Sequence, residues 1–142
     1  MNLAIIKSGA IIILLLIGAV YDLKKRTIPL LLILSFGAVI LLLSLIQPRL
    51  DIVKSCLGAL LGIVLLVLSK AFDGAVGEAD GLVMLIVGFG MGIYGGCVVL
   101  FYGLFLAALV SIVLLCFKKI SKKDSIPFVP FLLVSYLGVY LG

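Results

Sequence analysis

The chain has 142 residues, of which 65% are hydrophobic and only 12% are charged. Its mean hydropathy is +1.52, and a soluble domain of this length does not need so much apolar surface. The sequence therefore predicts an integral membrane protein with a single domain over residues 1–142. The net charge of +5 does not indicate a nucleic-acid partner, because the bases stand in short segments between apolar runs, where they usually set orientation.

The three cysteines, Cys56, Cys97 and Cys116, all lie in apolar runs. They form no CxxC spacing, and the chain has no histidine, so the sequence indicates neither a zinc site nor a disulfide framework. We interpret them as small buried core residues and expect no metal and no cofactor. The first apolar run has no convincing cleavage site before Tyr21, which favours a retained helix over a signal peptide.

A helix that crosses the hydrocarbon core needs about 20 residues. Because backbone polar groups in lipid must be satisfied within the segment, the apolar runs are predicted to be helices and not open strands. The expected fold is all-α with six transmembrane helices, at residues 3–20, 28–46, 53–69, 81–93, 96–117 and 126–141. The fourth is short and rich in glycine, which predicts either an extension beyond Tyr94 or close packing against a neighbour.

The charges between these helices predict an orientation. Eight of the 11 bases fall in the first, third and fifth loops: Lys24, Lys25, Arg26, Lys70, Lys118, Lys119, Lys122 and Lys123. The positive-inside rule then places these loops in the cytoplasm and both ends of the chain outside. The basic clusters also make anionic lipid headgroups expected partners. Most of the acids fall on the same side, namely Asp22, Asp73, Glu78, Asp80 and Asp124.

Two of these acids stand at helix ends. Asp22 ends the predicted first helix in the stretch YDLKKRTIP, and Asp80 enters the predicted fourth helix in the stretch GEAD. An ionisable group near the membrane is costly unless it faces protein or water. Two carboxylates that share a site do not both ionise easily, so one can activate a water while the other protonates a carbonyl. On the charges alone, the favoured interpretation of Asp22 is a solvated loop acid paired with Lys25 or Arg26.

Small residues surround the second acid, including Gly77 and Ala79. Glycine permits unusual backbone angles and close approach, as a site that grips an extended peptide requires, although a flexible loop has the same composition. Further along, Pro127 and Pro130 in SIPFVPF prevent a regular first turn and leave backbone groups free. Such groups are tolerated at membrane depth only beside protein or a cavity, and an extended substrate can pair with them. For Pro127 alone, a plain helix start is the favoured interpretation.

In this order on a six-helix chain, the stretches DLKKRTIP, GEAD and IPFVPF resemble the type IV prepilin peptidase family of GxGD-type intramembrane aspartic proteases. The resemblance covers nearly the whole chain. It implies that Asp22 and Asp80 are the catalytic aspartates, and that Pro127 and Pro130 belong to the family's proline-rich segment. The lack of CxxC and the short length imply a small form that has only the peptidase activity, without methyl transfer.

The chain departs from the family's pattern at several positions. Ala79 stands where the GxGD motif has its second glycine, and Leu82 stands where a lysine is frequent. Leu30 replaces a common asparagine, and Val129 replaces a usual glycine. An alanine in place of glycine restricts the backbone, so we expect these changes to tune the activity or narrow the substrate range. Both acids remain.

The resemblance also implies a substrate, a prepilin or pseudopilin with a short basic leader before a hydrophobic helix. Cleavage would occur at the cytoplasmic boundary of the bacterial inner membrane. Glu78 and Asp73 are the candidates for binding leader bases, although ordinary loop acids are the favoured interpretation of both. The alternative is a non-catalytic six-helix membrane protein, such as a transport or assembly subunit or an inactive peptidase homologue. A proton path is disfavoured, because no predicted helix carries an ionisable residue near its centre.

Overall fold

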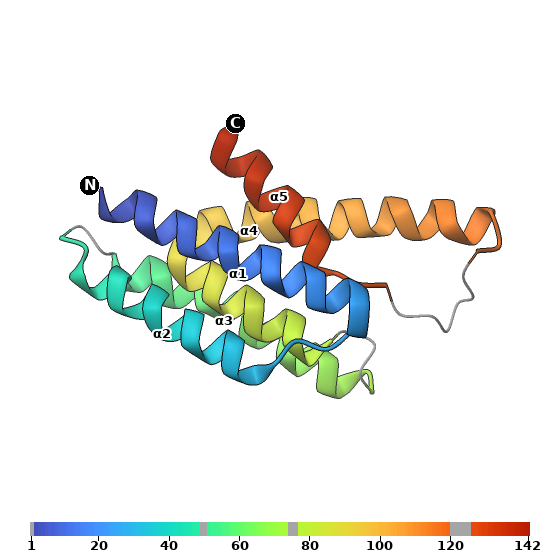
Figure 1. Cartoon of the computed structure of the whole chain (residues 1–142), viewed down its shortest axis with the longest axis horizontal. Coiled ribbons are helices and arrows are strands. Elements are labelled where there is room, and N and C mark those ends of the chain that lie inside the picture. The colour runs from blue at the N-terminus through green and yellow to red at the C-terminus, as the bar shows by residue number, and fades with distance from the viewer. Residues whose placement is uncertain (1, 49–50, 74–76, 120–125) are drawn as a thin grey trace.

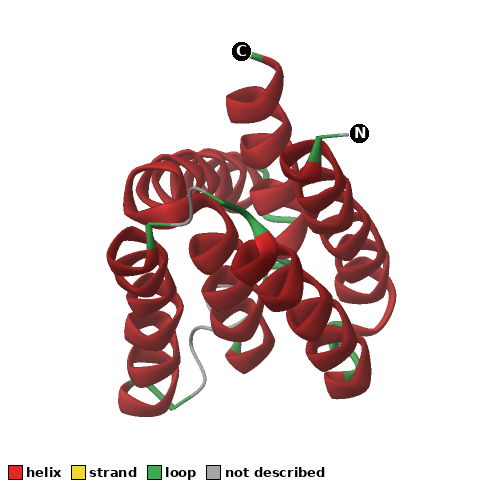
Figure 2. Ribbon diagram, turned by 90° about the vertical axis from the view of Figure 1, so that its left-hand side faces the viewer, coloured by secondary structure: helices red, strands yellow, loops and turns green. Residues whose placement is uncertain are grey.

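The computed structural model describes residues 2–48, 51–73, 77–119 and 126–142. Within these residues the secondary structure consists of five helices: α1 (Leu3–Lys25), α2 (Leu30–Ile46), α3 (Ile52–Ala71), α4 (Glu78–Cys116) and α5 (Val129–Leu141). Figure 1 shows them as an elongated bundle, and Figure 2 shows the same bundle turned by 90°. Three helices, α1, α3 and α4, are long and apolar enough to cross a membrane, whereas α2 and α5 are shorter apolar helices. The predicted all-helical fold is thus confirmed for the described residues.

The fourth and fifth predicted helices both lie within α4. Inside it, Gly92 has φ 80° and ψ 179°, a conformation that only glycine adopts readily. A Cβ built on Gly96 would lie 3.3 Å from the Cα of Gly88. In a straight helix these positions would be separated by about 12 Å along the axis. Therefore α4 folds back at Gly92 into two helical arms (Figure 1), and these arms lie where the fourth and fifth helices were predicted.

The first helix is longer than predicted. It continues past Val20 to Lys25, so Asp22 lies within its last turn and not in a loop. Arg26 then ends the helix with a φ of 53°, and its N–H donates to the carbonyl oxygen of Asp22 at 3.0 Å. Lys24 and Lys25 in the last turn complement the negative end of the helix dipole. Helical geometry therefore fixes the direction of the Asp22 side chain.

Glycines bring α3 and the first arm of α4 into backbone contact. A Cβ on Gly58 would collide with the backbone of Gly88, and a Cβ on Gly62 would collide with the backbone of Leu85. Small residues allow this approach between membrane helices, where van der Waals packing replaces the hydrophobic effect. The close packing predicted for the glycine-rich fourth helix is confirmed, and its partner is α3.

The prediction that the cysteines are buried is wrong. Cys56, Cys97 and Cys116 are free thiols, and all of them are exposed. In a membrane helix both the core face and the lipid face are apolar, so an apolar run does not reveal which face a residue occupies. A thiol behaves as a small hydrophobic group and is suited to either face.

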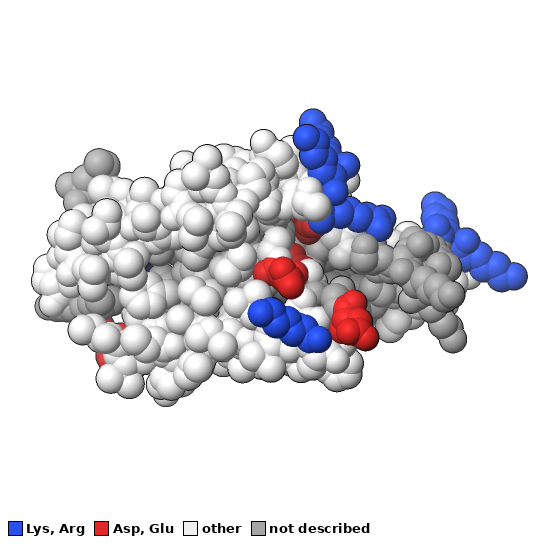
Figure 3. Space-filling model, turned by 90° about the horizontal axis from the view of Figure 1, so that it is seen from below, with Lys and Arg blue, Asp and Glu red and all other residues white. Residues whose placement is uncertain are grey.

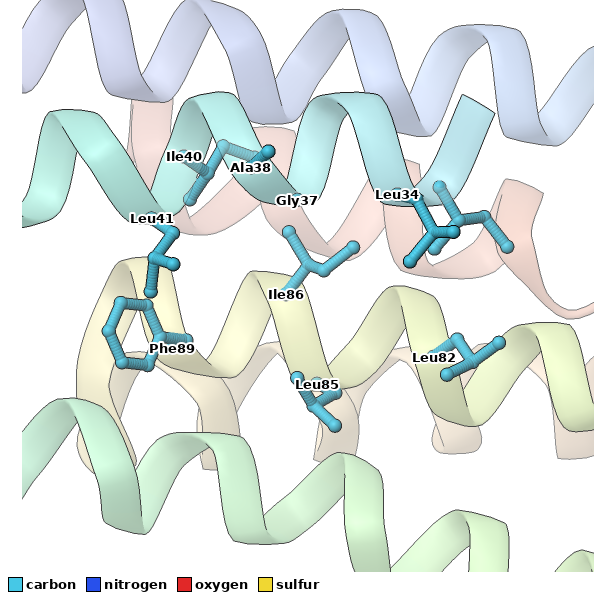
Figure 4. A pocket seen from close by; sticks show the side chains of 10 residues that line it. Leu34, Gly37, Ala38, Ile40, Leu41, Leu82, Leu85, Ile86 and Phe89 are labelled. Atoms are coloured by element: carbon cyan, nitrogen blue, oxygen red, sulfur yellow. The ribbon is translucent and has the colours of Figure 1, made fainter. Parts of the chain in front are cut away.

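An apolar groove of about 390 Å³ runs between α2 and the first arm of α4 (Figure 4). Leu34 and Gly37 of α2 face Leu82, Ile86 and Phe89 of α4 across it. Every residue that lines the groove is apolar or glycine. The groove therefore offers no acid–base chemistry, and we assign it to the apolar outer surface.

Charged side chains gather toward one end of the molecule (Figure 3). The exposed bases at this end lie in the last turn of a helix or just after it. They are Lys24, Lys25, Arg26, Lys70, Lys118 and Lys119. At the other end, Lys7 donates to the side-chain oxygen of Gln47 at 2.9 Å, and Lys54 pairs with Asp51 at 3.0 Å. Arg49, Lys122, Lys123 and Asp124 lie outside the described residues. The orientation of these ends in the membrane stays a prediction.

The contact between α3 and α4 can be tested with one methyl group. Gly58→Ala places that methyl against the backbone of Gly88, so we expect the free energy of unfolding in detergent to fall by about 1–3 kcal/mol, the usual cost of overpacking. Gly9→Ala in α1 is the matched control, because no atom lies within 4 Å of its added Cβ. Equal stability of the two variants would contradict the proposed contact.

Candidate functional site

Asp22 is held by the first residues of α5. The residue is 8% exposed, and its Oδ2 accepts the main-chain N–H of Val129 at 3.1 Å. The Phe128 backbone and the charge of Arg26 also favour a charge on the carboxylate. The positive end of the α5 dipole favours a negative charge at this place. The interpretation of Asp22 as a solvated loop acid is therefore wrong.

Asp80 lies in the first turn of α4 and is 9% exposed. Its N–H donates to the carbonyl oxygen of Gly77 at 3.1 Å, and the Gly77 backbone favours a charge on its carboxylate. The arrangement is similar to the capping box, in which the side chain of the third helical residue returns to the N-cap residue. The start of α4 thus holds the carboxylate, much as the start of α5 holds Asp22.

Gly77 has a steric role in this cap. A Cβ on Gly77 would lie only 2.8 Å from Oδ2 of Asp80, so the carboxylate occupies the space that a side chain would need. By contrast, Ala79 is half-buried and its methyl packs against the hydrophobic core. The methyl group that departs from the GxGD pattern is therefore accommodated. Glu78 is exposed at the first position of the helix.

The two carboxylates come together although they are far apart in the sequence. The charge of Asp22 acts on the Asp80 carboxylate, and α1, α4 and α5 all contact one another. Two like charges in a site with little water do not both ionise easily. Such a pair can take a proton from a water with one member and give a proton with the other.

Pro127 and Pro130 flank the amides that bind Asp22. Both prolines are half-buried, and Pro130 is at the second position of α5, where its missing N–H costs little. The carbonyl oxygen of Phe128 accepts the N–H groups of Phe131 and Leu132 at 3.0 and 3.2 Å. The expectation of free backbone groups is therefore wrong for Phe128 and Val129. A role of the prolines in substrate binding stays a prediction.

The sequence reasoning missed the residue on α1 that receives α5. A Cβ on Gly18 would lie 3.3 Å from Cγ1 of Val129. Gly18 and Asp22 are four residues apart and so share one face of α1. Val129 contacts both of them, the first with its side chain and the second with its N–H. The signal available in the sequence was the position of Gly18, one helical turn before Asp22.

Metal ligands are not gathered at this site. Within the residues that the structure describes, no group of three or more His, Cys, Asp and Glu side chains could hold a metal ion. The groups available for chemistry are the two carboxylates and the main-chain donors beside them.

Comparison with known protein families identifies a match. A model of the type IV leader peptidase family matches residues 9–112. The matched region contains Asp22, Gly77, Glu78 and Asp80, whereas Pro127 and Pro130 lie beyond it. No curated protein and no solved structure matches the chain.

The convergence of the two acids can be tested by cross-linking. In a background with the three native cysteines replaced by alanine, we expect a short bifunctional thiol reagent to join Asp22→Cys to Asp80→Cys. Pairing Asp22→Cys with Asp51→Cys is the control, because Asp51 caps α3 at the opposite end of the bundle (Figure 1). A protease site placed between the two cysteines makes the cross-link visible on a gel. After digestion, the cross-linked chain stays in one piece, whereas the chain without a cross-link separates into two fragments. Equal yields from both pairs would refute the convergence.

Proposed function

Because the chain belongs to the type IV leader peptidase family, we propose that it is an aspartic endopeptidase that removes the basic leader of prepilins or pseudopilins. The observation that carries this proposal is the meeting of two buried carboxylates, Asp22 and Asp80, at the ends of separate helices. Both lie inside the matched region. In an apolar bundle, buried acids that serve no purpose are costly.

The proposed reaction is hydrolysis by one water held between the two carboxylates. The ionised member takes a proton from the water, whose oxygen attacks the carbonyl carbon of the scissile peptide bond. The protonated member gives its proton to the carbonyl oxygen, which yields a neutral tetrahedral intermediate. When the C–N bond breaks, the nitrogen takes the proton from one carboxyl of the dyad and leaves as an amine. One hydroxyl of the intermediate gives its proton to the other carboxylate, which yields the carboxyl product and restores the singly protonated dyad. No covalent bond to the enzyme forms in this scheme.

The surroundings suggest how a substrate would be held. We assign leader binding to the exposed acids at the charged end, Glu78 and Asp73, because a basic leader is attracted to negative charge. Gly77, Pro127 and Pro130 are proposed to border the path of the extended peptide. Exposed bases such as Lys24 and Lys118 are proposed to contact anionic lipid headgroups. In this arrangement the site faces the cytoplasm of a bacterial cell, at the inner membrane, and both chain ends lie outside.

The first test of this function replaces each acid. Asp22→Asn and Asp80→Asn should each abolish cleavage of a synthetic prepilin in detergent, because an amide neither takes the proton from the water nor returns it. Asp51→Asn is the matched control, since this acid is exposed at the start of α3, at the other end of the bundle, and asparagine caps a helix about as well as aspartate. It should keep the wild-type rate. Wild-type rates from both dyad variants would end the assignment. A folded wild-type protein that cleaves no prepilin would favour the alternative, an inactive homologue or assembly subunit.

The second test moves one carboxylate without removing it. Gly77→Ala should push the Asp80 carboxylate aside, because the new Cβ would be 2.8 Å from its Oδ2. A displacement of this size typically lowers turnover by about a hundredfold, and we expect that loss in kcat with little change in thermal stability. Gly138→Ala in α5 is the control, as no atom lies within 4 Å of its added Cβ. Unchanged turnover in Gly77→Ala would contradict the steric role of Gly77.

A further inference from the structure

We propose that the main-chain N–H of Val129 positions Asp22 and keeps it the ionised member of the pair, so that Asp22 is the base and Asp80 the acid. This inference rests on the proposed function and deepens it by assigning the two proton-transfer roles. It also makes Val129 a positioning residue, although its side chain carries no polar group.

The hydrogen bonds around the two acids are unequal. Asp22 accepts the N–H of Val129 at 3.1 Å, and the Phe128 backbone and Arg26 also favour its charge. No hydrogen bond to the Asp80 carboxylate is formed by the described residues; the Gly77 backbone favours its charge, and Asp22 repels it. A carboxylate with more donors holds its charge more easily. When the pair carries one proton, that proton therefore resides on Asp80.

The dipole of each acid's own helix favours the reverse assignment, with the charge on Asp80. Asp22 is at the negative end of α1, and Asp80 is at the positive end of α4. A direct hydrogen bond to a charged group outweighs the effect of a helix dipole at a partly exposed end. The positive end of α5 also faces Asp22 and offsets the end of α1. The donors from α5 thus decide the balance.

The local sequence of α5 directs these donors at Asp22. Pro127 and Pro130 have no N–H, so Phe128 and Val129 supply the only two amides in this four-residue stretch. The Val129 side chain is fully buried and packs over Gly18, one turn before Asp22 on α1. Val129 is the first residue of α5, so the start of the helix sets the direction of its N–H. The proline pair therefore also serves Asp22, beside the substrate-binding role proposed above.

Other charges near Asp22 are few in the described part of the chain. The charged groups that act on it are Arg26 on its own helix and Asp80 from α4, while α5 contributes main-chain amides. Asp80→Asn removes the partner acid as well as changing the base. The sharper experiment leaves every side chain in place and removes one N–H.

That experiment replaces the amide at position 129 with an ester, by incorporating the hydroxy-acid analogue of valine during translation. We expect kcat for prepilin cleavage to fall by about tenfold to a hundredfold, the usual effect of losing one hydrogen bond to a charged group. KM should stay nearly unchanged. The acidic limb of the pH–rate profile should move to higher pH, because ionised Asp22 has lost a donor. The same ester at Val134, an exposed α5 residue, is the control and should cleave like wild type.

A second variant separates the N–H from the packing. Val129→Ala keeps the donor and loses part of the contact with Gly18, so its acidic limb should match that of wild type. If Val129→Ala shifts the limb and the ester does not, packing is responsible and the inference is overturned. Wild-type kcat and pH profile in the ester variant would overturn it directly.

A spectroscopic measurement keeps this test apart from the test of function. With 13C-labelled aspartate, the infrared band that disappears in Asp22→Asn reports the state of that carboxylate. Near neutral pH we expect the band of an ionised carboxylate. In the protein with the ester at position 129 this band should appear at a higher pH than in the protein with the ester at position 134. This readout needs no substrate, so it holds even if wild type cleaves no prepilin. An identical titration of the band in both esters would sink the role of Val129.

Discussion

A buried carboxylate in a bundle with so little polar surface persists only where something other than bulk water stabilises its charge. Main-chain N–H groups stabilise the carboxylates at this site. Val129 at the beginning of α5 binds Asp22, and the backbone of Gly77 at the beginning of α4 favours a charge on Asp80. Each acid is therefore located by the point at which a helix starts, and the site depends on those two starting points.

Helix packing decides where these starting points lie. Gly58 and Gly62 bring α3 against the first arm of α4, which sets the level of the turn before Asp80. The reversal at Gly92 returns the second arm alongside, where the hydroxyl of Ser135 on α5 donates to the carbonyl oxygen of Val99 at 2.7 Å. Residues without side chains thus allow the backbone contacts that bring two distant acids together.

Hydropathy predicted the apolar helices well, because lipid leaves few alternatives to a helix. It predicted their ends less well: α1 continues through Asp22 to Lys25, since charged residues at the membrane surface extend a helix as readily as they interrupt it. The charge pattern brought Asp22 and Asp80 to one end but did not predict their partners. The partners are backbone groups, which every residue except proline carries, so residue identity gave no signal for Val129.

The same reasoning accounts for the departures from the family's pattern. Because the donors are main-chain atoms, Ala79 and Val129 leave the partners of both carboxylates intact while adding a methyl to the core and a side chain over Gly18. The restrictive positions are those where a side chain would occupy the space of a functional group or its support. Gly77 meets the Asp80 carboxylate, and Gly18 meets Val129. In this site, the positions that must lack a side chain tolerate fewer substitutions than the positions that supply main-chain donors. The residues at those positions perform no chemistry themselves.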